Sequence, residues 1–192
     1  VNKTSLRGFH MMVQIHTVIS NTKPEDLIYH GSARPTSFGA IRNTFIWKGF
    51  NLSVNVSYRL GYFYRINSVN YSQVLQGVGS HSDFGNRWQN PGDELVTIVP
   101  SIPAISNSNR DNLYLFSENL VRKGDHIRLQ DIRLGYTMSK SKFAQLPFEQ
   151  IELYSYANNL GILWKASDDN LDPDFQLFRP QRSISFGLRI DF

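Results

Sequence analysis

The last ten residues constrain the fold most strongly, because large apolar side chains occupy every even position from Ile184 to Phe192. Ser, Gly, Arg or Asp occupies each odd position from Ser183 to Asp191. Successive side chains of a β-strand point to opposite faces, so this segment predicts a strand with one apolar and one polar face. About ten alternating residues is also the length that crosses a bilayer as a tilted strand. The central question is therefore whether these apolar faces meet lipid or a protein core.

Bulk composition removes several classes of protein. The chain has 192 residues, enough for a domain with a core, and the lack of cysteine excludes disulfides and thiolate metal sites. Its net charge of +4 is mild and predicts no nucleic-acid partner. Mean hydropathy is −0.33, and no apolar run is long enough to predict a transmembrane helix. Since the chain starts at Val1 without a signal-peptide pattern, we expect a mature or internal piece of a longer product.

Two alternating segments, 39–47 and 50–62, flank Lys48-Gly49 and predict a tight β-hairpin. Paired residues of a hairpin share one face of the sheet. We therefore expect one apolar and one polar face. The predicted pairs are Trp47 with Phe50, Phe45 with Leu52, Asn43 with Val54 and Ile41 with Val56.

Further strands are predicted over 124–136, 150–157 and 183–192. In the first of these the apolar phase changes near Gln130-Asp131, which indicates one inserted bulge residue. A weaker alternation over 9–15 gives a candidate strand, and no helix is expected because no long apolar stripe with a 3.6-residue period occurs.

The predicted fold class is all-β, with about five antiparallel up-and-down transmembrane β-barrel strands, two long extracellular loops and only part of a barrel. We expect an irregular segment or one extra strand over 1–35, and the barrel strands over 36–192.

The connections alternate in length, with short ones at 48–49 and 139–148 and long ones at 65–112 and 158–180. Antiparallel strands place alternate connections at opposite ends, as in outer-membrane barrels with short periplasmic turns. Short apolar runs such as 95–99 are read as strand extensions. Alternation is common to a soluble β-sandwich and a barrel, and periodicity alone favours the sandwich, so a soluble carbohydrate-binding module stays the alternative. The loop asymmetry and terminal Phe192 favour the barrel.

Patterns that carry catalysis or bind metals are weak, and we expect neither an enzyme nor a cofactor. The run His81-Ser82-Asp83 names the three residues of a triad, but sequence neighbours do not form one. The acidic segment 168–174 has the oxygen spacing of a calcium loop but lacks its glycine, and Arg179 stands at its twelfth position, so solvated acids are favoured. Trp88 and Tyr71 are candidates to stack on a ligand in the long loop, with aromatic loop packing as the alternative.

Short segments spread along the chain carry a further signal. They are Tyr29-His30-Gly31-Ser32-Ala33-Arg34-Pro35, Phe38-Gly39-Ala40-Ile41-Arg42-Asn43-Thr44-Phe45, Trp47-Lys48-Gly49-Phe50, Arg87-Trp88-Gln89-Asn90-Pro91-Gly92-Asp93-Glu94, Lys123-Gly124-Asp125-His126-Ile127-Arg128-Leu129-Gln130, Leu134-Gly135-Tyr136, Tyr156-Ala157-Asn158-Asn159-Leu160 and Arg182-Ser183-Ile184-Ser185-Phe186-Gly187-Leu188. Together, and in this order, they resemble the carboxy-terminal part of SusC/RagA-type TonB-linked outer-membrane transporters. The likeness covers roughly residues 24–192.

The resemblance implies a large barrel with an amino-terminal plug that imports glycans or peptides across the outer membrane of Bacteroidetes-type bacteria. It implies a SusD-like lipoprotein lid over the outer loops and TonB on the periplasmic side, reached through the plug. Bacterial barrels need at least eight strands to close, so we expect the remainder of the same transporter to supply the plug and the other strands. Phe192 is implied as the assembly signal.

Under this interpretation the apolar face meets outer-membrane lipid and the polar face lines the lumen. The residues expected to face lipid are Phe45, Trp47, Phe50, Leu52, Val54, Val56, Ile132, Leu134, Ile184, Phe186, Leu188 and Ile190. The residues expected to face the lumen are Ser53, Asn55, Ser57, Arg59, Arg133, Glu152, Tyr154, Arg189 and Asp191. A lysine should therefore be costly at Val54 and nearly silent at Ser53.

Overall fold

The computed structural model describes residue 23 and residues 27–192, and the chain divides into two compact units. The first unit comprises Val1–His30 and Arg65–Arg122, and the second comprises Gly31–Tyr64 and Lys123–Phe192. The candidate strand over 9–15 lies outside the described residues.

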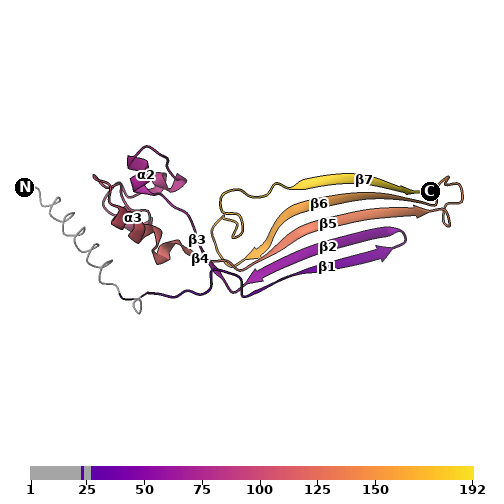
Figure 1. Cartoon of the computed structure of the whole chain (residues 1–192), viewed down its shortest axis with the longest axis horizontal. Helices are drawn as coiled ribbons and strands as arrows, with labels where there is room; N and C mark the ends of the chain where they lie inside the picture. Colours follow the sequence, from indigo (N-terminus) through magenta and orange to yellow (C-terminus); the bar gives the residue numbers. More distant parts are fainter. Residues whose placement is uncertain (1–22, 24–26) are drawn as a thin grey trace, which may run out of the picture. The chain divides into compact units, whose positions relative to one another are not determined.

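The second unit is built on a five-stranded antiparallel sheet in which the strands lie in chain order (Figure 1). This arrangement confirms the predicted all-β fold of up-and-down strands that form part of a barrel. Among the described residues, β1 and β7 each pair with one neighbour only, so both are edges of the sheet. The strands are β1 Ser37–Trp47, β2 Phe50–Leu60, β5 His126–Ser139, β6 Gln150–Lys165 and β7 Ser183–Asp191.

The β1–β2 hairpin has the predicted register, with Trp47 opposite Phe50 and Phe45 opposite Leu52. Its two turn residues both adopt positive φ, 48° at Lys48 and 97° at Gly49. Two such residues in succession are the requirement of the tight hairpin turn whose twist matches the flanking strands. The turn therefore fixes which side chains of β1 and β2 share a face.

The predicted bulge in β5 is confirmed, because the register between β2 and β5 shifts at Gln130. Asn55 lies opposite Asp131, whereas the next residue, Val56, lies opposite Leu129. Gln130 is thus the extra residue. Because of it, Leu129 before the bulge and Ile132 after it lie on the same face of the sheet, although one has an odd and the other an even number.

Strand β6 is longer than predicted, because it runs to Lys165 instead of ending at Ala157. The Asn158-Asn159 pair predicts the start of a loop, since asparagine favours turns. In the structure Asn159 has φ 55° and lies where the β5–β6 register shifts. The same left-handed preference therefore makes a bulge within a continuous strand, and the second long loop begins only at residue 166.

The first unit corrects the expectation of strand and loop alone, since its described part contains short helices. Two α-helices begin at asparagine caps, where the side chains of Asn70 and Asn107 accept hydrogen bonds from the backbone N–H groups of Gln73 and Arg110. None of the described helices is long and apolar enough to span a membrane. The helices are α2 Tyr71–Leu75, α3 Ser108–Leu115 and the 3₁₀ turns η2 Ser82–Asn86, η3 Asp93–Leu95 and η4 Glu118–Leu120.

A small apolar core organises this unit, with Val69, Tyr71, Val99, Tyr114 and Leu120 buried together. The segment 95–99 is therefore no strand extension: it leaves η3 and delivers Val99 to this core. A two-stranded ribbon of β3 Phe63–Arg65 and β4 Val121–Lys123 completes the regular elements.

Candidate functional site

One face of the five-stranded sheet is apolar from β1 to β7. In β2, Leu52 and Val54 lie opposite Leu134 and Ile132 of β5. In β6, Leu153 lies opposite Leu188 of β7, and the pairing places all twelve residues predicted to face lipid on this side.

The apolar face is exposed, not packed as a core. Phe186 is 83% exposed, Ile184 68% and Trp47 66%. Among the described residues, Tyr62 and Pro173 are the only buried apolar side chains of this unit. A soluble sandwich would bury such a face beneath a second sheet, so the exposure is the pattern expected when lipid is the solvent.

The opposite face is polar and carries a hydrogen-bonded network around Asp131, which is 4% exposed. One carboxylate oxygen of Asp131 accepts from Arg42 Nη2 at 3.2 Å and from Asn55 Nδ2 at 2.8 Å. The register places the nine residues predicted to face the lumen on this side of the sheet.

Ser53 is more constrained than the sequence indicated. It is 7% exposed, and its Oγ accepts from Thr44 Oγ1 at 3.3 Å and from Arg42 Nη1 at 3.5 Å. Arg133 lies opposite it on β5. A lysine at Ser53 would stand between two arginines, so the expectation of a nearly silent change does not fit this packing.

Further toward the short-turn end, Arg133 Nη2 donates to Glu152 Oε1 at 2.6 Å, and its guanidinium lies 4.8 Å from the centre of the Tyr154 ring. Tyr154 faces Gly187 of β7, where an added Cβ would overlap the ring. The missing side chain of Gly187 is what allows the ring to lie flat across the polar face.

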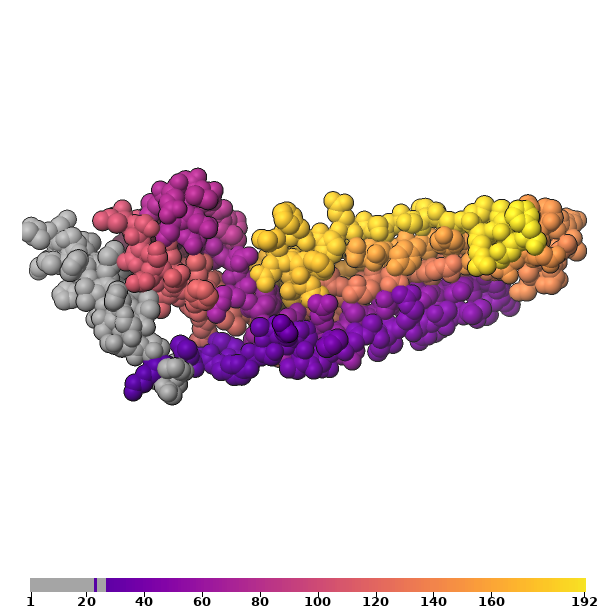
Figure 2. All heavy atoms as spheres, in the orientation of Figure 1, coloured from indigo at the N-terminus to yellow at the C-terminus, as the bar shows by residue number. Residues whose placement is uncertain are grey.

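At the other end of the sheet, residues 166–182 connect β6 to β7, and we call this segment the strap. Figure 2 shows its gold atoms gathered at the end of the strands opposite the C-terminal residues. Arg59 at the end of β2 and His126 at the start of β5 face each other in the register, and Arg128 follows on the same face. Three cationic or ionisable side chains therefore meet the strap.

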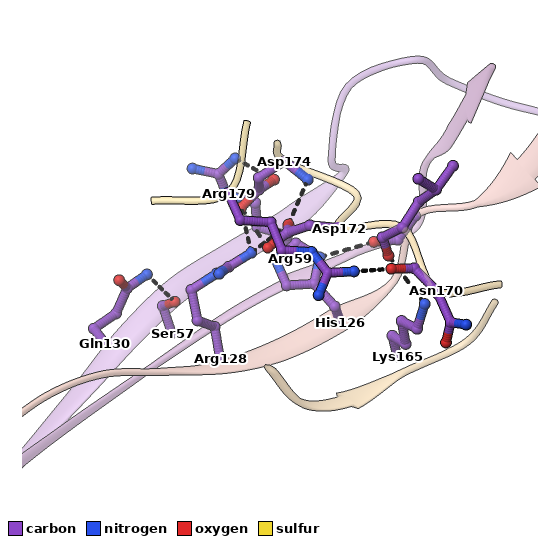
Figure 3. Close-up of polar contacts among 12 residues, drawn as sticks. Ser57, Arg59, His126, Arg128, Gln130, Lys165, Asn170, Asp172, Asp174 and Arg179 are labelled. Atoms are coloured by element: carbon purple, nitrogen blue, oxygen red, sulfur yellow. Dashed lines mark hydrogen bonds and ion pairs between the residues drawn. The ribbon is translucent and has the colours of Figure 1, made fainter. Parts of the chain in front are cut away.

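Two aspartates of the strap bind these side chains (Figure 3). Arg128 Nη2 donates to Asp172 Oδ1 at 2.5 Å. Asp174 accepts from Arg59 Nη1 at 2.8 Å, and its other oxygen lies 3.2 Å from His126 Nε2. Burial disfavours the charged carboxylate of Asp174, but His126, Arg59 and Arg128 outweigh this and hold its pKa below the ordinary value.

The expectation of solvated acids in this loop is therefore wrong for Asp172, which is 5% exposed and paired with an arginine that is 4% exposed. Two of the side chains that a calcium loop would present, Asp172 and Asp174, are instead paired with Arg128, Arg59 and His126. Within the described ranges no group of three or more acidic, histidine or cysteine side chains has the geometry of a metal site.

The two aromatic candidates for ligand contact differ in position. Tyr71 is 1% exposed and belongs to the core of the first unit, in agreement with the alternative of aromatic loop packing. Burial raises the pKa of its hydroxyl to about 12. Trp88 is half-buried and its Nε1 donates to the carbonyl of Thr97 at 2.5 Å. Ligand stacking at Trp88 stays a prediction.

The run His81-Ser82-Asp83 is a helix cap. His81 Nδ1 accepts from the backbone N–H of Asp83, and the Asp83 carboxylate accepts from Ser68 Oγ at 2.6 Å. These contacts begin the turn η2.

Sequence reasoning missed the buried polar group at Asp131 and its partner Arg42. The signal was present, since the predicted hairpin and bulge together align Arg42, Asn55 and Asp131 across three strands. The strap cluster had no such signal, because Arg59 and Asp174 are 115 positions apart in the chain.

The chain is similar to known proteins in sequence and in fold. It matches no protein-family model. It is 27% identical over 169 residues to TonB-dependent receptor P39 of Formosa agariphila, a match that covers 80% of this chain and 16% of that protein. The chain therefore spans less than a fifth of this curated relative.

Solved structures of the RagAB peptide transporter share its fold. One matches with a TM-score of 0.63 and 20% identity over 90% of this chain and 19% of the other. The importer in its open-open state matches with a TM-score of 0.62 and 20% identity, over 89% of this chain and 19% of that one. These matches confirm the resemblance to SusC/RagA-type TonB-linked transporters that the sequence predicted, and with it the bacterial outer membrane as the location of these strands.

Proposed function

We propose that this chain forms part of the barrel wall of an outer-membrane, TonB-dependent nutrient importer, with its apolar face toward lipid and its polar face toward the lumen. The observation that carries the proposal is the apolar face, which is continuous over five strands and exposed. A lipid-facing barrel surface needs this continuity, since every strand alternates apolar outward and polar inward.

The partners and cargo follow the same reasoning. The short turns and Asp191 lie at one end of the sheet, and the long connections leave from the other (Figure 1). We expect the long-connection end to face outward beneath a SusD-like lipoprotein, and TonB to act through the plug in the remainder of the transporter. An oligosaccharide or a peptide is the expected substrate, and the similarity to the RagAB peptide importer supports the second.

The alternative, a soluble carbohydrate-binding module, requires its apolar face to be covered. Leu134 on β5 and Leu153 on β6, in the middle of that face, are 45% and 51% exposed, which disfavours it. An enzyme is not proposed, since the clustered polar groups are engaged in structural ion pairs.

The proposal is tested by placing a lysine on either face at one depth, in the full transporter polypeptide. Val54→Lys puts a charge on the apolar face near the middle of β2 and is expected to cost about 2–4 kcal/mol and to reduce assembly. Asn55→Lys, its neighbour on the polar face, can keep a contact with Asp131, which Asn55 now contacts at 2.8 Å.

The readout is the heat-modifiable, folded band of the receptor in outer-membrane extracts. The expected result is loss of the folded band in Val54→Lys with near-normal assembly in Asn55→Lys. Equal assembly of the two variants would show that the apolar face does not meet hydrocarbon.

A further inference from the structure

A polar cavity lies under the strap, entirely within the second unit. It has a volume of about 340 Å³ and is lined by the polar-face end of β5, by β6 and by both arms of the strap. That volume lies at the lower end of the range for small-molecule sites and admits one sugar ring or one amino-acid side chain. The charged residues of the lining are Arg128, Lys165, Asp172, Arg179 and Arg182.

Two of the four cationic side chains of this cavity are already paired with the strap. Lys165 Nζ donates to two oxygens of the strap, the Asp169 carboxylate at 3.2 Å and the carbonyl of Leu171 at 3.0 Å. Arg128 is paired with Asp172. Both pairs build the wall of the cavity.

The remaining two arginines are exposed and leave an excess of positive charge. Arg179 donates to the carbonyl of Asn170, a neutral partner (Figure 3). Arg182 makes no hydrogen bond or ion pair with the residues that the structure describes. Neither guanidinium is neutralised by a carboxylate among the described residues. The planar guanidinium group binds carboxylate oxygens well, because its N–H donors match their geometry.

A second, independent observation also indicates a ligand. The Arg128 side chain is only 5% exposed, and its Nε is buried without a hydrogen-bond partner among the described residues. A buried donor without an acceptor is unfavourable, so an acceptor that reached this Nε would gain a hydrogen bond.

The backbone of β6 is shaped around the same cavity. The register with β5 shifts on both sides of the stretch that lines it, between Ile127 and Arg128 and again between Leu129 and Asp131. Gly161, with φ 127°, lines the cavity, and an added Cβ there would lie 3.6 Å from Arg182 Nη2. Bulges of this kind re-aim side chains and are common beside functional sites.

We propose that this cavity binds a carboxylate group of the solute that the transporter takes up. The inference rests on the proposed function for its biological role and names the class of substrate. The shared chemistry has two sources, acidic side chains of a peptide or acidic sugars of a glycan, and the experiment separates them.

The test measures binding to the purified full transporter in detergent by calorimetry. The probes are a glutamate-containing hexapeptide, its glutamine counterpart, tetragalacturonate and neutral maltotetraose. The expected result is that one acidic probe binds more tightly than its neutral counterpart, and that Arg182→Gln and Arg179→Gln each weaken its binding about tenfold. Arg34→Gln, which removes the same charge from an exposed position outside the cavity, should leave binding unchanged.

The acidic probe that responds identifies the source of the anion. The proposal is overturned if neither acidic probe is preferred, or if Arg34→Gln lowers affinity as much as the two cavity variants. Binding is measured without transport, so its failure in a receptor that assembles and imports solute would leave the proposed function standing.

Discussion

At the scale of the residue, the chain places its most costly polar groups where the register brings opposite charges together. Asp131 lies where the predicted hairpin and bulge align it with Arg42 and Asn55, so this contact follows from the sequence. The contacts of Asp174 could not be predicted in this way, because its partners Arg59 and His126 are far away in the sequence and no short-range pattern links them. Pairings set by register are therefore predictable, and those set by the fold of a long loop are not.

Asp174→Asn tests whether this cluster holds the strap. The change removes the charge that binds Arg59 and His126, and charge-assisted hydrogen bonds contribute about 1.5–3 kcal/mol each. We expect amide hydrogens in 166–182 to exchange about ten- to a hundredfold faster in the full transporter, as followed by mass spectrometry.

Asp168→Asn is the matched control, since Asp168 is an exposed acid of the same segment. Equal acceleration in both variants, or none in either, would mean that the cluster does not determine the local stability of the strap.

At the scale of the element, the register was predictable from the two-residue turn and the alternating pattern, whereas the end of β6 was not. Asn158-Asn159 has the composition of a turn. The structure forms a bulge there because the strand resumes its pairing with β5 from Gly161 to Lys165. The helices α2 and α3 escaped prediction because five and eight residues are too few to establish an apolar period. Asparagine caps were the signal available for them.

Gly187→Val tests the close contact between β6 and β7. A side chain at Gly187 would displace the Tyr154 ring from its place against Arg133. Overpacking of this kind typically costs about 1–3 kcal/mol, so we expect a lower melting temperature of the full transporter in detergent. Gly79→Val, at a glycine with open space around its Cα, should leave the melting temperature near that of the unmodified protein. A wild-type melting temperature in Gly187→Val would show that Tyr154 is free to move aside.

For the molecule as a whole, alternation and loop lengths predicted the fold class. They did not predict the short helices and the small core of the first unit. Its described part is held by a core of five side chains drawn from 69–120, none of which belongs to a periodic run. The sheet has two unpaired edges and an exposed apolar face. The described residues of the chain do not cover these surfaces.

The chain expressed alone should therefore aggregate in buffer, since unpaired strand edges and exposed apolar surface both promote association. Sedimentation and size-exclusion chromatography with and without detergent provide the measurement. A water-soluble monomer in buffer would favour the soluble carbohydrate-binding module instead.

The length of β6 has a consequence for the height of the wall. Its 16 residues, at about 3.3 Å each, extend about 50 Å, and a tilt of about 45° leaves a vertical rise of about 35 Å. The hydrophobic band of such barrels is about 25 Å tall. With the short turns on the periplasmic side, the last third of β6, next to the strap, would extend beyond the hydrocarbon as a rigid rim in water. Lys165 and the arginines beside it would then occupy that rim, where a charged solute could be sorted before it ever descended to membrane depth.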